Sequence, residues 1–465
     1  MLRSISRLVL FSALILVPVL AWSQTVSAKL HTAFTAFRQD PQLRNAISAL
    51  YVLDAQTGMV VHNTNGLVGL APASTQKVIT SISAYELLGK GFRYETKFAC
   101  HQSQQQAALL ILPAGDPTLG SWRWPGTQEE VVLQGLTQAI RRAGLSAFQA
   151  VYVDNQGWQE ESLPGGWIWQ DIGNYYGAGP GKLNWRENQY DVFLKSGQHI
   201  GDPVQVVATH PKMNGYKLQS QLSSAAAGTG DNAYIYFPMT GATGVIRGTI
   251  PVNESRFKIS GAMPLPADQF VRTLADTLSA RGINTPVKAS GPPPATIPPG
   301  QYRLLHTVTS PPLDSIVYWF NQKSINLYGE ALLKTIAFKS KGTAATDAGT
   351  ELIRDFWSQK GIPQSELNLV DGSGLSPLNR VTARAQVALL QHARQQAWFK
   401  GFYAALPRYN RMKMKSGTIR GVKGYCGYHQ SKDGREYVFS FLVNNYSGSP
   451  AALVQKMYRV LDVLK

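Results

Sequence analysis

The chain has 465 residues, which is long enough for two or three domains with a sizeable buried core. Its formal net charge is +17, from 45 Lys and Arg against 28 Asp and Glu, and such an excess indicates an anionic partner or surface. The two cysteines and eight scattered histidines form no cluster with zinc spacing, so we expect no metal site and no cofactor.

The first 23 residues have the pattern of a secretory signal. Arg3 and Arg7 give a basic start, residues 8–20 form a largely apolar run of 13 that is short for a membrane span, and Ala21-Trp22-Ser23 offers a cleavage site. An uncleaved anchor is the alternative. No later stretch is apolar enough to span a bilayer, so we expect a periplasmic or secreted protein with no membrane span after cleavage.

The next elements lead to a short motif. Residues 47–53 and 59–62 are predicted to be paired strands around a turn at 54–58. After a loop, Ser74-Thr75-Gln76-Lys77 opens a helical run that continues to residue 88. A serine one helical turn ahead of a lysine places hydroxyl and amine on the same face of a helix. A buried lysine can lose its proton there and activate the serine without a histidine.

The middle of the chain alternates helix and strand. The predicted elements are a helix over 128–143, a strand over 150–153, a helix over 267–280 and a strand over 287–290. This repetition is either a weak internal duplication or, as we favour, ordinary α+β sequence. Residues 189–260 show short alternating runs between Gly, Asn and Ser turns, which predicts an all-β segment. Residues 291–300 are mostly Pro and Gly, as in an extended linker.

The last part of the chain is mainly helical and ends in a hairpin and a helix. Helices are predicted over 324–339, 346–360, 382–396 and 451–464, a strand from 413–416, and a hairpin from 424–429 and 436–444. Since the first motif lies near the start and its partners near the end, the simplest account is one catalytic domain built from both chain ends, with an inserted middle.

Two more motifs lie in this last part. Ser324-Ile325-Asn326 is the only Ser-x-Asn in the sequence, and Lys415-Ser416-Gly417-Thr418 begins a strand. Single motifs of this length are weak, because Ser255-Arg256-Phe257-Lys258 repeats the first and Lys195-Ser196-Gly197 repeats the third. The second Ser-x-x-Lys lies in a strand-like stretch, where serine and lysine point to opposite faces. The order and context of the three motifs carry the argument.

In this combination the chain resembles the low-molecular-mass class C penicillin-binding proteins, the D-alanyl-D-alanine carboxypeptidase/endopeptidase group. The resemblance covers the mature chain and includes the long insert, Ala114-Gly115-Asp116-Pro117-Thr118-Leu119 and Asp371-Gly372-Ser373-Gly374-Leu375-Ser376. It implies an α/β (α+β) fold in which a β-lactamase/transpeptidase-like domain, an antiparallel sheet flanked by helices, carries two inserted domains. It also implies an enzyme that cleaves peptidoglycan stem peptides and cross-links and binds β-lactam antibiotics.

The expected domain boundaries follow from the inserted middle. We expect a signal peptide over 1–23, a catalytic domain over 24–95 and 301–465, a second domain over 96–188 and 261–300, and a third, mostly β, over 189–260.

Acyl transfer to a serine needs a nucleophile, a base, a proton donor for the leaving group and an oxyanion hole. We expect Ser74 to be the nucleophile and Lys77 the base. Ser324, helped by Lys415, would pass a proton to the leaving D-alanine, and Asn326 would hold the acyl-side amide and keep Lys77 oriented.

The remaining candidates concern substrate binding. Lys415, Ser416, Gly417 and Thr418 suit a terminal carboxylate, and by resemblance the N–H groups of Ser74 and Thr418 form the oxyanion hole. Asp154 matches the position from which the second domain of relatives touches a diamino-acid side chain, and a strand-end turn former is the alternative. Some relatives carry an arginine at the place of Pro377, with Arg380 three residues further on in this chain.

Several alternatives stay open at this stage. A β-lactamase is one, although a drug-sized substrate does not need so long an insert, and a non-catalytic peptidoglycan-binding scaffold is another. The positive charge fits a carboxylate-bearing cell-wall polymer better than nucleic acid, which an exported chain rarely meets; a generally basic surface is the plain alternative. Cys100 and Cys426 could pair in an oxidising compartment. The oligomeric state is not predicted.

Overall fold

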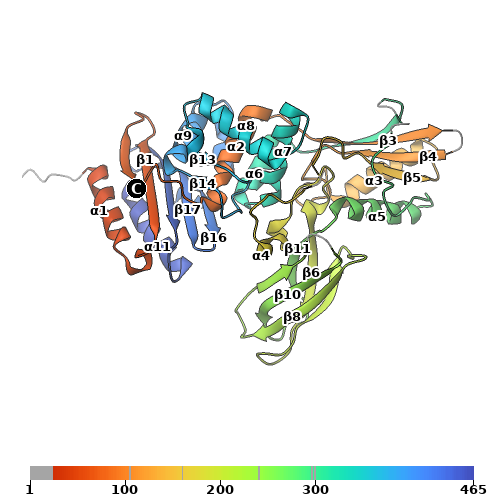
Figure 1. Ribbon diagram of the computed structural model, residues 1–465, viewed down its shortest axis with the longest axis horizontal. Helices are drawn as coiled ribbons and strands as arrows, with labels where there is room; N and C mark the ends of the chain where they lie inside the picture. Colours follow the sequence, from red (N-terminus) through yellow and green to blue (C-terminus); the bar gives the residue numbers. More distant parts are fainter. Residues whose placement is uncertain (1–24, 104–105, 160, 239–240, 295–296, 298–299) are drawn as a thin grey trace, which may run out of the picture.

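A computed structural model describes residues 25–465, except 104–105, 160, 239–240, 295–296 and 298–299, and places three sheet-bearing parts along an elongated molecule (Figure 1). The predicted signal segment, 1–23, lies outside the described residues. Within the described part of the chain, no helix is both long and apolar enough to cross a membrane.

The largest sheet joins the two ends of the described chain. Its strands lie in the order β15-β16-β17-β18-β1-β2, and all neighbours are antiparallel. The first strand pairs with the last, from Ile47 opposite Asn444 to Asp54 opposite Tyr437. The strands are β1 Ile47–Asp54, β2 Val60–Thr64, β15 Arg408–Tyr409, β16 Met412–Ile419, β17 Val422–Gln430 and β18 Glu436–Asn444.

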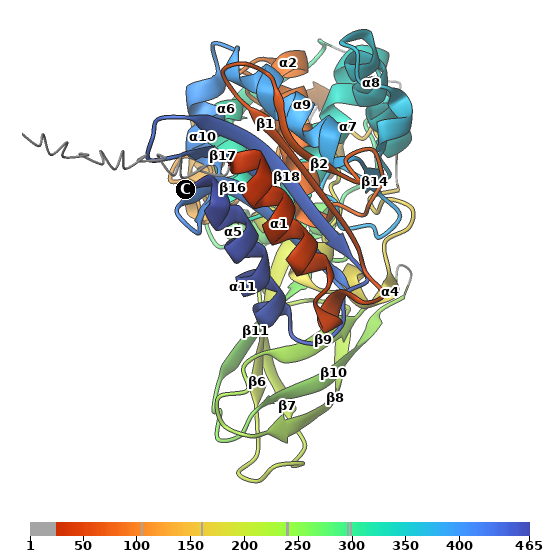
Figure 2. The same cartoon turned by 90° about the vertical axis from the view of Figure 1, so that its left-hand side faces the viewer.

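Helices cover both faces of this sheet, because the side chains of its central strands alternate between two apolar cores. Phe439 and Phe441 of β18 pack with α1 (Val26–Arg38) and α11 (Pro450–Leu461), which lie side by side in Figure 2. Val438 and Leu442 belong to the core on the other face. The helices around that second core are α2 Lys77–Leu88, α6 Leu313–Gln322, α7 Asn326–Lys341, α8 Thr346–Gln359, α9 Ala383–Arg394 and α10 Phe399–Ala405.

A second, four-stranded sheet has the order β12-β3-β4-β5 and packs against two helices. The predicted helices 128–143 and 267–280 are confirmed here as α3 (Glu129–Arg142) and α5 (Pro266–Ser279). The strands are β3 Glu95–Ser103, β4 Gln106–Leu112, β5 Ala150–Val153 and β12 Arg303–Thr309.

One expectation about this region is wrong. No strand forms over 287–290; Ser290 and the next residue, Gly291, only share two backbone hydrogen bonds with β5, from Ser290 N–H to Val151 O and from Val153 N–H to Gly291 O. The prolines that follow have no N–H with which to extend the pairing. β12 pairs with β3, although it follows the linker, so this sheet extends beyond the boundary expected at residue 300.

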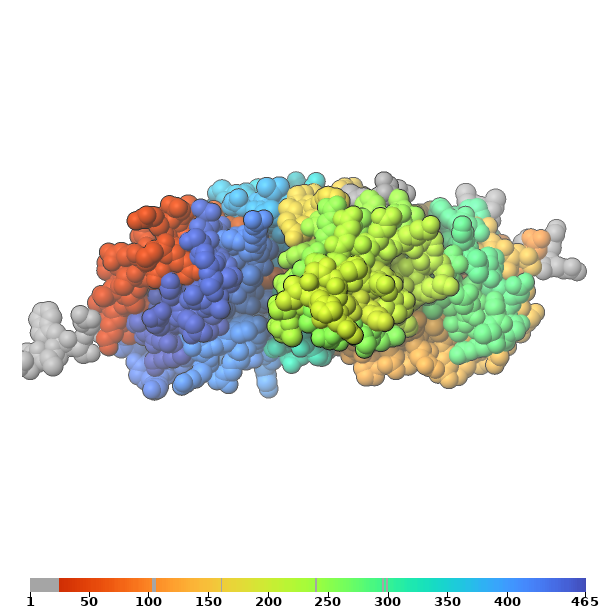
Figure 3. Space-filling model, turned by 90° about the horizontal axis from the view of Figure 1, so that it is seen from below, coloured from red at the N-terminus to blue at the C-terminus, as the bar shows by residue number. Residues whose placement is uncertain are grey.

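The all-β prediction for 189–260 is confirmed. Two three-stranded sheets, β8-β10-β9 and β11-β6-β7, enclose one apolar core. Figure 3 shows this unit in yellow-green, standing in front of the middle of the molecule. The strands are β6 Gln189–Lys195, β7 Gln205–His210, β8 Lys217–Ala225, β9 Asn232–Tyr236, β10 Thr243–Pro251 and β11 Phe257–Ala262.

The six-stranded sheet takes no strand from the described residues between β3 and β12. We therefore keep the division into a domain from both chain ends and two inserted domains as a proposal, with the second boundary moved to follow β12. Cys100 on β3 and Cys426 on β17 are both buried and free, so the disulfide considered from sequence does not form.

Candidate active site

The serine of the first motif lies in a tight turn at the start of a buried helix. Ala73–Gln76 forms a 3₁₀ turn that runs directly into α2. β16 passes very close to this turn: a Cβ on Gly417 would lie 2.5 Å from the carbonyl oxygen of Pro72 and 3.0 Å from the backbone nitrogen of Ser74. Glycine is thus needed at this position of the third motif, because any side chain would push the strand away from Ser74.

Lys77 is fully buried and has three polar partners. Its Nζ lies 2.9 Å from Ser74 Oγ, 2.7 Å from Asn326 Oδ1 and 2.7 Å from the carbonyl oxygen of Ser373. Burial, with the positive charge of Lys415 in addition, holds the pKa of the Lys77 amine well below its ordinary value. The amine is therefore easily deprotonated in the folded protein.

The partners of Lys77 show how its lone pair is directed. Asn326 Oδ1 and the Ser373 carbonyl are acceptors, so they take the two N–H groups of a neutral amine. The third direction, towards Ser74, is left for the nitrogen lone pair. A neutral Lys77 can thus accept the proton of the Ser74 hydroxyl.

The second and third motifs meet beside this pair. Ser324 has a left-handed backbone, with φ of 58°, just before α7 begins. Lys415 Nζ on β16 donates to Ser324 Oγ at 3.1 Å and to the Ser416 carbonyl at 3.0 Å. Burial, together with the charge of Lys423, lowers the pKa of Lys415 to about 8.

Asn326 connects the motifs to the insert. Its Nδ2 donates to the carbonyl oxygen of Tyr176 at 2.7 Å, while its Oδ1 accepts from Lys77. These two contacts fix which side of the amide faces the lysine. The insert therefore orients a residue of the site directly.

These residues open onto one cavity of about 880 Å³. Ser74, Ser324, Asn326 and Thr418 line it from one side. The insert contributes Arg123, Gln170, Asp171, Tyr175, Tyr176 and Tyr234. The cavity is large enough for an extended peptide and lies between the sheet domain and the insert.

The loop 371–376 supplies one of the hydrogen-bond acceptors of Lys77. Asp371 is buried, and its two oxygens accept five hydrogen bonds, from Gln76 Nε2, Gly374 N–H, Asn379 Nδ2, Ser376 N–H and Trp167 Nε1. These five contacts hold the Asp371 side chain and the surrounding loop in one arrangement. The loop is in turn held so that the carbonyl of Ser373 points at Lys77.

Glu330 is a second buried carboxyl group with a contrasting environment. Its Oε2 accepts from the Gly372 N–H at 2.8 Å, and its Oε1 has no hydrogen-bond partner among the described residues. Burial, and then the negative charge of Asp371, raises the pKa of Glu330 to about 8. This environment favours the protonated form of Glu330.

Two candidates from the sequence lie elsewhere. Asp154 does not line the Ser74 cavity; it lines a second cavity, of about 420 Å³, and pairs with Lys182 Nζ at 2.7 Å. Arg380, on the short β14 (Arg380–Val381), is exposed, lines neither cavity and donates to the carbonyl oxygens of Pro377 and Asn379. The structure thus places neither side chain in the Ser74 cavity, and a role of either in substrate binding stays a prediction.

The other candidates have these positions. Thr418 lines the cavity and its Oγ1 accepts from Lys423 Nζ at 2.7 Å. In the repeat of the first motif, Lys258 does not contact Ser255. Lys258 Nζ, on β11, lies 3.3 Å from Asp191 Oδ2 instead.

Sequence reasoning missed three groups. The sequence around Glu330 is that of an ordinary helix, Tyr176 contributes only its backbone carbonyl, and Arg123 belongs to no motif.

The Asp371–Ser376 stretch is part of the resemblance to the family. No sequence signal marks its Ser373 carbonyl as a partner of Lys77.

The chain is similar to known proteins of one family. A family model described as the D-Ala-D-Ala carboxypeptidase 3 (S13) family matches residues 30–462. A D-alanyl-D-alanine carboxypeptidase of Actinomadura sp. (strain R39) is 26% identical over 90% of this chain and 82% of its own. D-alanyl-D-alanine carboxypeptidase DacB of Haemophilus influenzae is 21% identical over 83% of each chain.

A solved structure shares the fold. The crystal structure of penicillin binding protein 4 from Haemophilus influenzae aligns with a TM-score of 0.78 at 20% identity, over 93% of this chain and 99% of that one. The expected α/β fold of the β-lactamase/transpeptidase type with an insert is thereby confirmed.

The protonated state of Glu330 gives a prediction about stability. The pKa of its carboxyl group is raised from an ordinary 4.5 to about 8 on folding, so the folded state holds a proton that the unfolded state releases. This costs stability progressively as pH rises from about 5 to 8. Glu330→Gln removes the titration, so its free energy of unfolding relative to the parent should increase by a few kcal/mol over that interval.

Urea unfolding at pH 5 and pH 8 would measure this difference. Glu351→Gln is the matched control, because Glu351 is an exposed glutamate that pairs with Lys341 at the surface. Its effect should be small and should not grow with pH. If Glu330→Gln changes the free energy of unfolding by the same amount at both pH values, Glu330 is ionised in the folded protein.

Proposed function

The chain belongs to the D-Ala-D-Ala carboxypeptidase 3 (S13) family, and we propose that it cleaves the D-alanyl-D-alanine bond of peptides through an acyl-enzyme on Ser74. The single observation that carries this proposal is the arrangement around Lys77. The Lys77 amine has no exposed surface. In its neutral form its two N–H groups donate to the oxygens of Asn326 and Ser373, and its lone pair points to Ser74 Oγ, 2.9 Å away.

The first chemical step follows from this arrangement. Lys77 takes the proton of the Ser74 hydroxyl as Oγ bonds to the carbonyl carbon, and the carbonyl electrons move to its oxygen. The N–H groups of Ser74 and Thr418 would stabilise that oxyanion. Gly417 supports this role for Thr418, since it lets β16 approach the Ser74 turn.

The second step expels D-alanine. As the C–N bond breaks, the leaving nitrogen needs a proton, which Ser324 Oγ can deliver. Ser324 Oγ regains a proton from the Lys415 ammonium, 3.1 Å away, so Lys415 ends the step neutral and can take back a proton from water, through Ser324, in deacylation, while Lys77 returns its proton to Ser74 Oγ. Water then attacks the ester of Ser74 by the reverse path, releases the shortened peptide and restores the hydroxyl.

Lys415 also supports recognition of the terminal carboxylate. It is almost fully buried, and a buried cation binds a carboxylate far more strongly than an exposed one. Thr418 lines the cavity next to it and offers a hydroxyl. A C-terminal carboxylate at this place would set the register of the D-alanyl-D-alanine bond over Ser74.

The natural substrate we propose is the stem peptide of peptidoglycan, cleaved in the cell envelope, with cross-links as a second target. The large cavity, the positive net charge and the signal-like first 23 residues support this setting. A haemophilus relative of the same fold has been crystallised with a β-lactam, which supports β-lactam binding here. Neither a β-lactamase nor a non-catalytic scaffold is favoured by an observation of its own.

The nucleophile can be tested by covalent labelling. Benzylpenicillin should add one acyl group to the parent protein, and Ser74→Ala should abolish the adduct, because Ser74 Oγ is the only hydroxyl among the described partners of Lys77. Ser255→Ala, in the repeated motif, should label like the parent. Intact-mass measurement with peptide mapping reads the result, and an adduct that persists in Ser74→Ala would remove Ser74 as the nucleophile.

The base can be tested with a lysine pair. Lys77→Ala should lower the acylation rate by roughly 10²-fold or more, the usual scale for loss of a general base, while the protein stays folded. Lys258→Ala is the control, because Lys258 occupies the same place in the repeated motif and pairs with Asp191. Stopped-flow acylation by a chromogenic cephalosporin measures both; unchanged acylation in Lys77→Ala would exclude it as the base.

Carboxylate recognition is tested on strand β16. Lys415→Ala should reduce kcat/KM for a peptide ending in a free D-alanyl-D-alanine more than for the same peptide ending in the C-terminal amide. Lys413→Ala, two residues earlier on the strand, should affect neither peptide. Equal losses on both peptides would assign Lys415 to proton transfer alone.

A further inference from the structure

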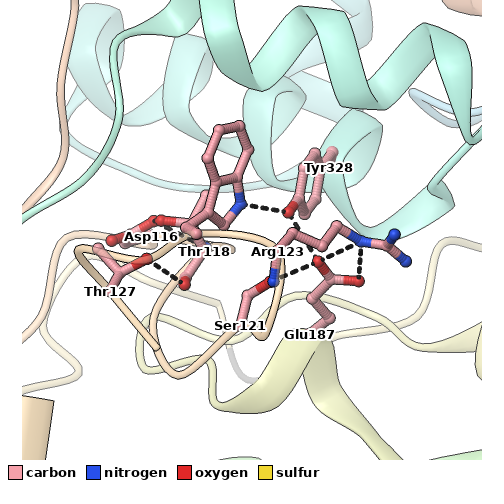
Figure 4. A network of polar contacts seen from close by, with 8 residues as sticks. Asp116, Thr118, Ser121, Arg123, Thr127, Glu187 and Tyr328 are labelled. Carbon is pink, nitrogen blue, oxygen red and sulfur yellow. Dashed lines mark hydrogen bonds and ion pairs between the residues drawn. The ribbon is translucent and has the colours of Figure 1, made fainter. Parts of the chain in front are cut away.

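Arg123 enters the Ser74 cavity from the insert, and the proposed mechanism gives it no role. It lies in the loop between β4 and α3, and its side chain lines the cavity with Ser74 and Asn326. Figure 4 shows it in a polar network that meets at Glu187 and ties this loop to α7.

The guanidinium group of Arg123 is held only through its Nε atom. Its Nε donates to Glu187 Oε1 at 2.8 Å and Oε2 at 3.1 Å (Figure 4). The guanidinium carbon lies 5.3 Å from the centre of the Trp122 ring and 5.8 Å from that of Trp319. Among the residues that the structure describes, neither Nη1 nor Nη2 has a hydrogen-bond acceptor. Two nitrogens with four N–H groups thus remain for a ligand.

Glu187 holds Arg123 and has no exposed surface for a ligand. It is fully buried, and it also accepts from Ser121 Oγ at 2.7 Å and Tyr328 OH at 2.8 Å. Arg186, Glu187 and Asn188 all have left-handed backbones, with φ of 55°, 54° and 51°. Three consecutive non-glycine residues in that region are strained, and such strain concentrates at functional sites.

The charges around the cavity favour an anionic ligand. Its lining includes Arg123, Lys323 and Arg420 but a single carboxylate, Asp171. A guanidinium held at Nε presents a planar pair of donors, the geometry that matches a carboxylate.

The position of Arg123 indicates which substrate carboxylate it meets. Glu187 links it to Tyr328, which lies on α7 two residues after Asn326. Asn326 is the residue we assign to the acyl-side amide, whereas the C-terminal carboxylate belongs to Lys415 on β16. Arg123 therefore approaches from the acyl side of the cleaved bond.

We propose that Arg123, positioned by Glu187, binds a second carboxylate of the substrate, on the acyl side of the D-alanyl-D-alanine pair. This rests on the proposed function of Ser74 and adds to it a preference for acidic peptides.

Two matched peptides test the proposal: N-acetyl-L-Glu-D-Ala-D-Ala and N-acetyl-L-Gln-D-Ala-D-Ala. The parent enzyme should show kcat/KM roughly 10-fold or more higher for the glutamate peptide, the usual size for a charge-assisted pair. Arg123→Gln should remove that preference while leaving the glutamine peptide and benzylpenicillin acylation within about 3-fold of the parent. Arg123→Lys, which keeps the charge but loses the planar fork, should retain part of the preference.

The control is Arg256→Gln, because Arg256 stacks on Phe193 in the all-β unit and does not line the cavity. It should keep the full preference. Equal turnover of the two peptides by the parent, or an equal loss on both in Arg123→Gln, overturns the role of Arg123. If the parent cleaves neither peptide and Ser74 is not acylated, the proposed function itself fails.

A second measurement covers the case in which Arg123→Gln does not fold. Carbenicillin differs from benzylpenicillin by one added carboxylate on its acyl side chain. The parent should be acylated faster by carbenicillin, and the ratio of the two rates should fall as salt is raised. A ratio of one that salt does not change would also overturn the proposal.

Discussion

The structure depends on the complete burial of one amine. Lys77 has no exposed surface, and a charged ammonium at such a place would lose its hydration without a carboxylate in contact to replace it. The protein surrounds it instead with oxygens from three separate segments, the Ser74 turn, the start of α7 and the 371–376 loop. The packing of those segments therefore decides both whether Lys77 is neutral and where its lone pair points.

The same principle separates the two buried acids behind Lys77. Asp371 accepts five hydrogen bonds, whereas Glu330 accepts one from a backbone N–H, and burial raises the pKa of the Glu330 carboxyl group. The raised pKa of Glu330 disfavours a negative charge on this carboxyl group near Lys77. A negative charge there would raise the pKa of Lys77 and leave less of the neutral amine at neutral pH, so the poor hydrogen bonding of Glu330 favours a neutral Lys77.

The sequence predicted the fold and the meeting of its three motifs, because their residue types and order carry the chemistry. It could not place Asp154 or Arg380. Asp154 does follow a strand, but its partner Lys182 is brought to it by a loop 28 positions later, and Arg380 lies on a two-residue strand that turns outward. Arg123 could not be predicted for a related reason. Its orientation is set by Glu187, and no local sequence pattern predicts three consecutive residues with left-handed backbones.

The pairing of β1 with β18 has a consequence for the life of the chain. Residues 47–54 must wait for residues 437–444 before the central sheet can close, and Thr418 reaches the Ser74 turn only as part of that sheet. A chain that ends before β18 leaves β1 without one of its two neighbouring strands. The order of strands therefore couples closure of the central sheet to the last part of the sequence, and through β16 it couples the surroundings of Ser74 to the same step.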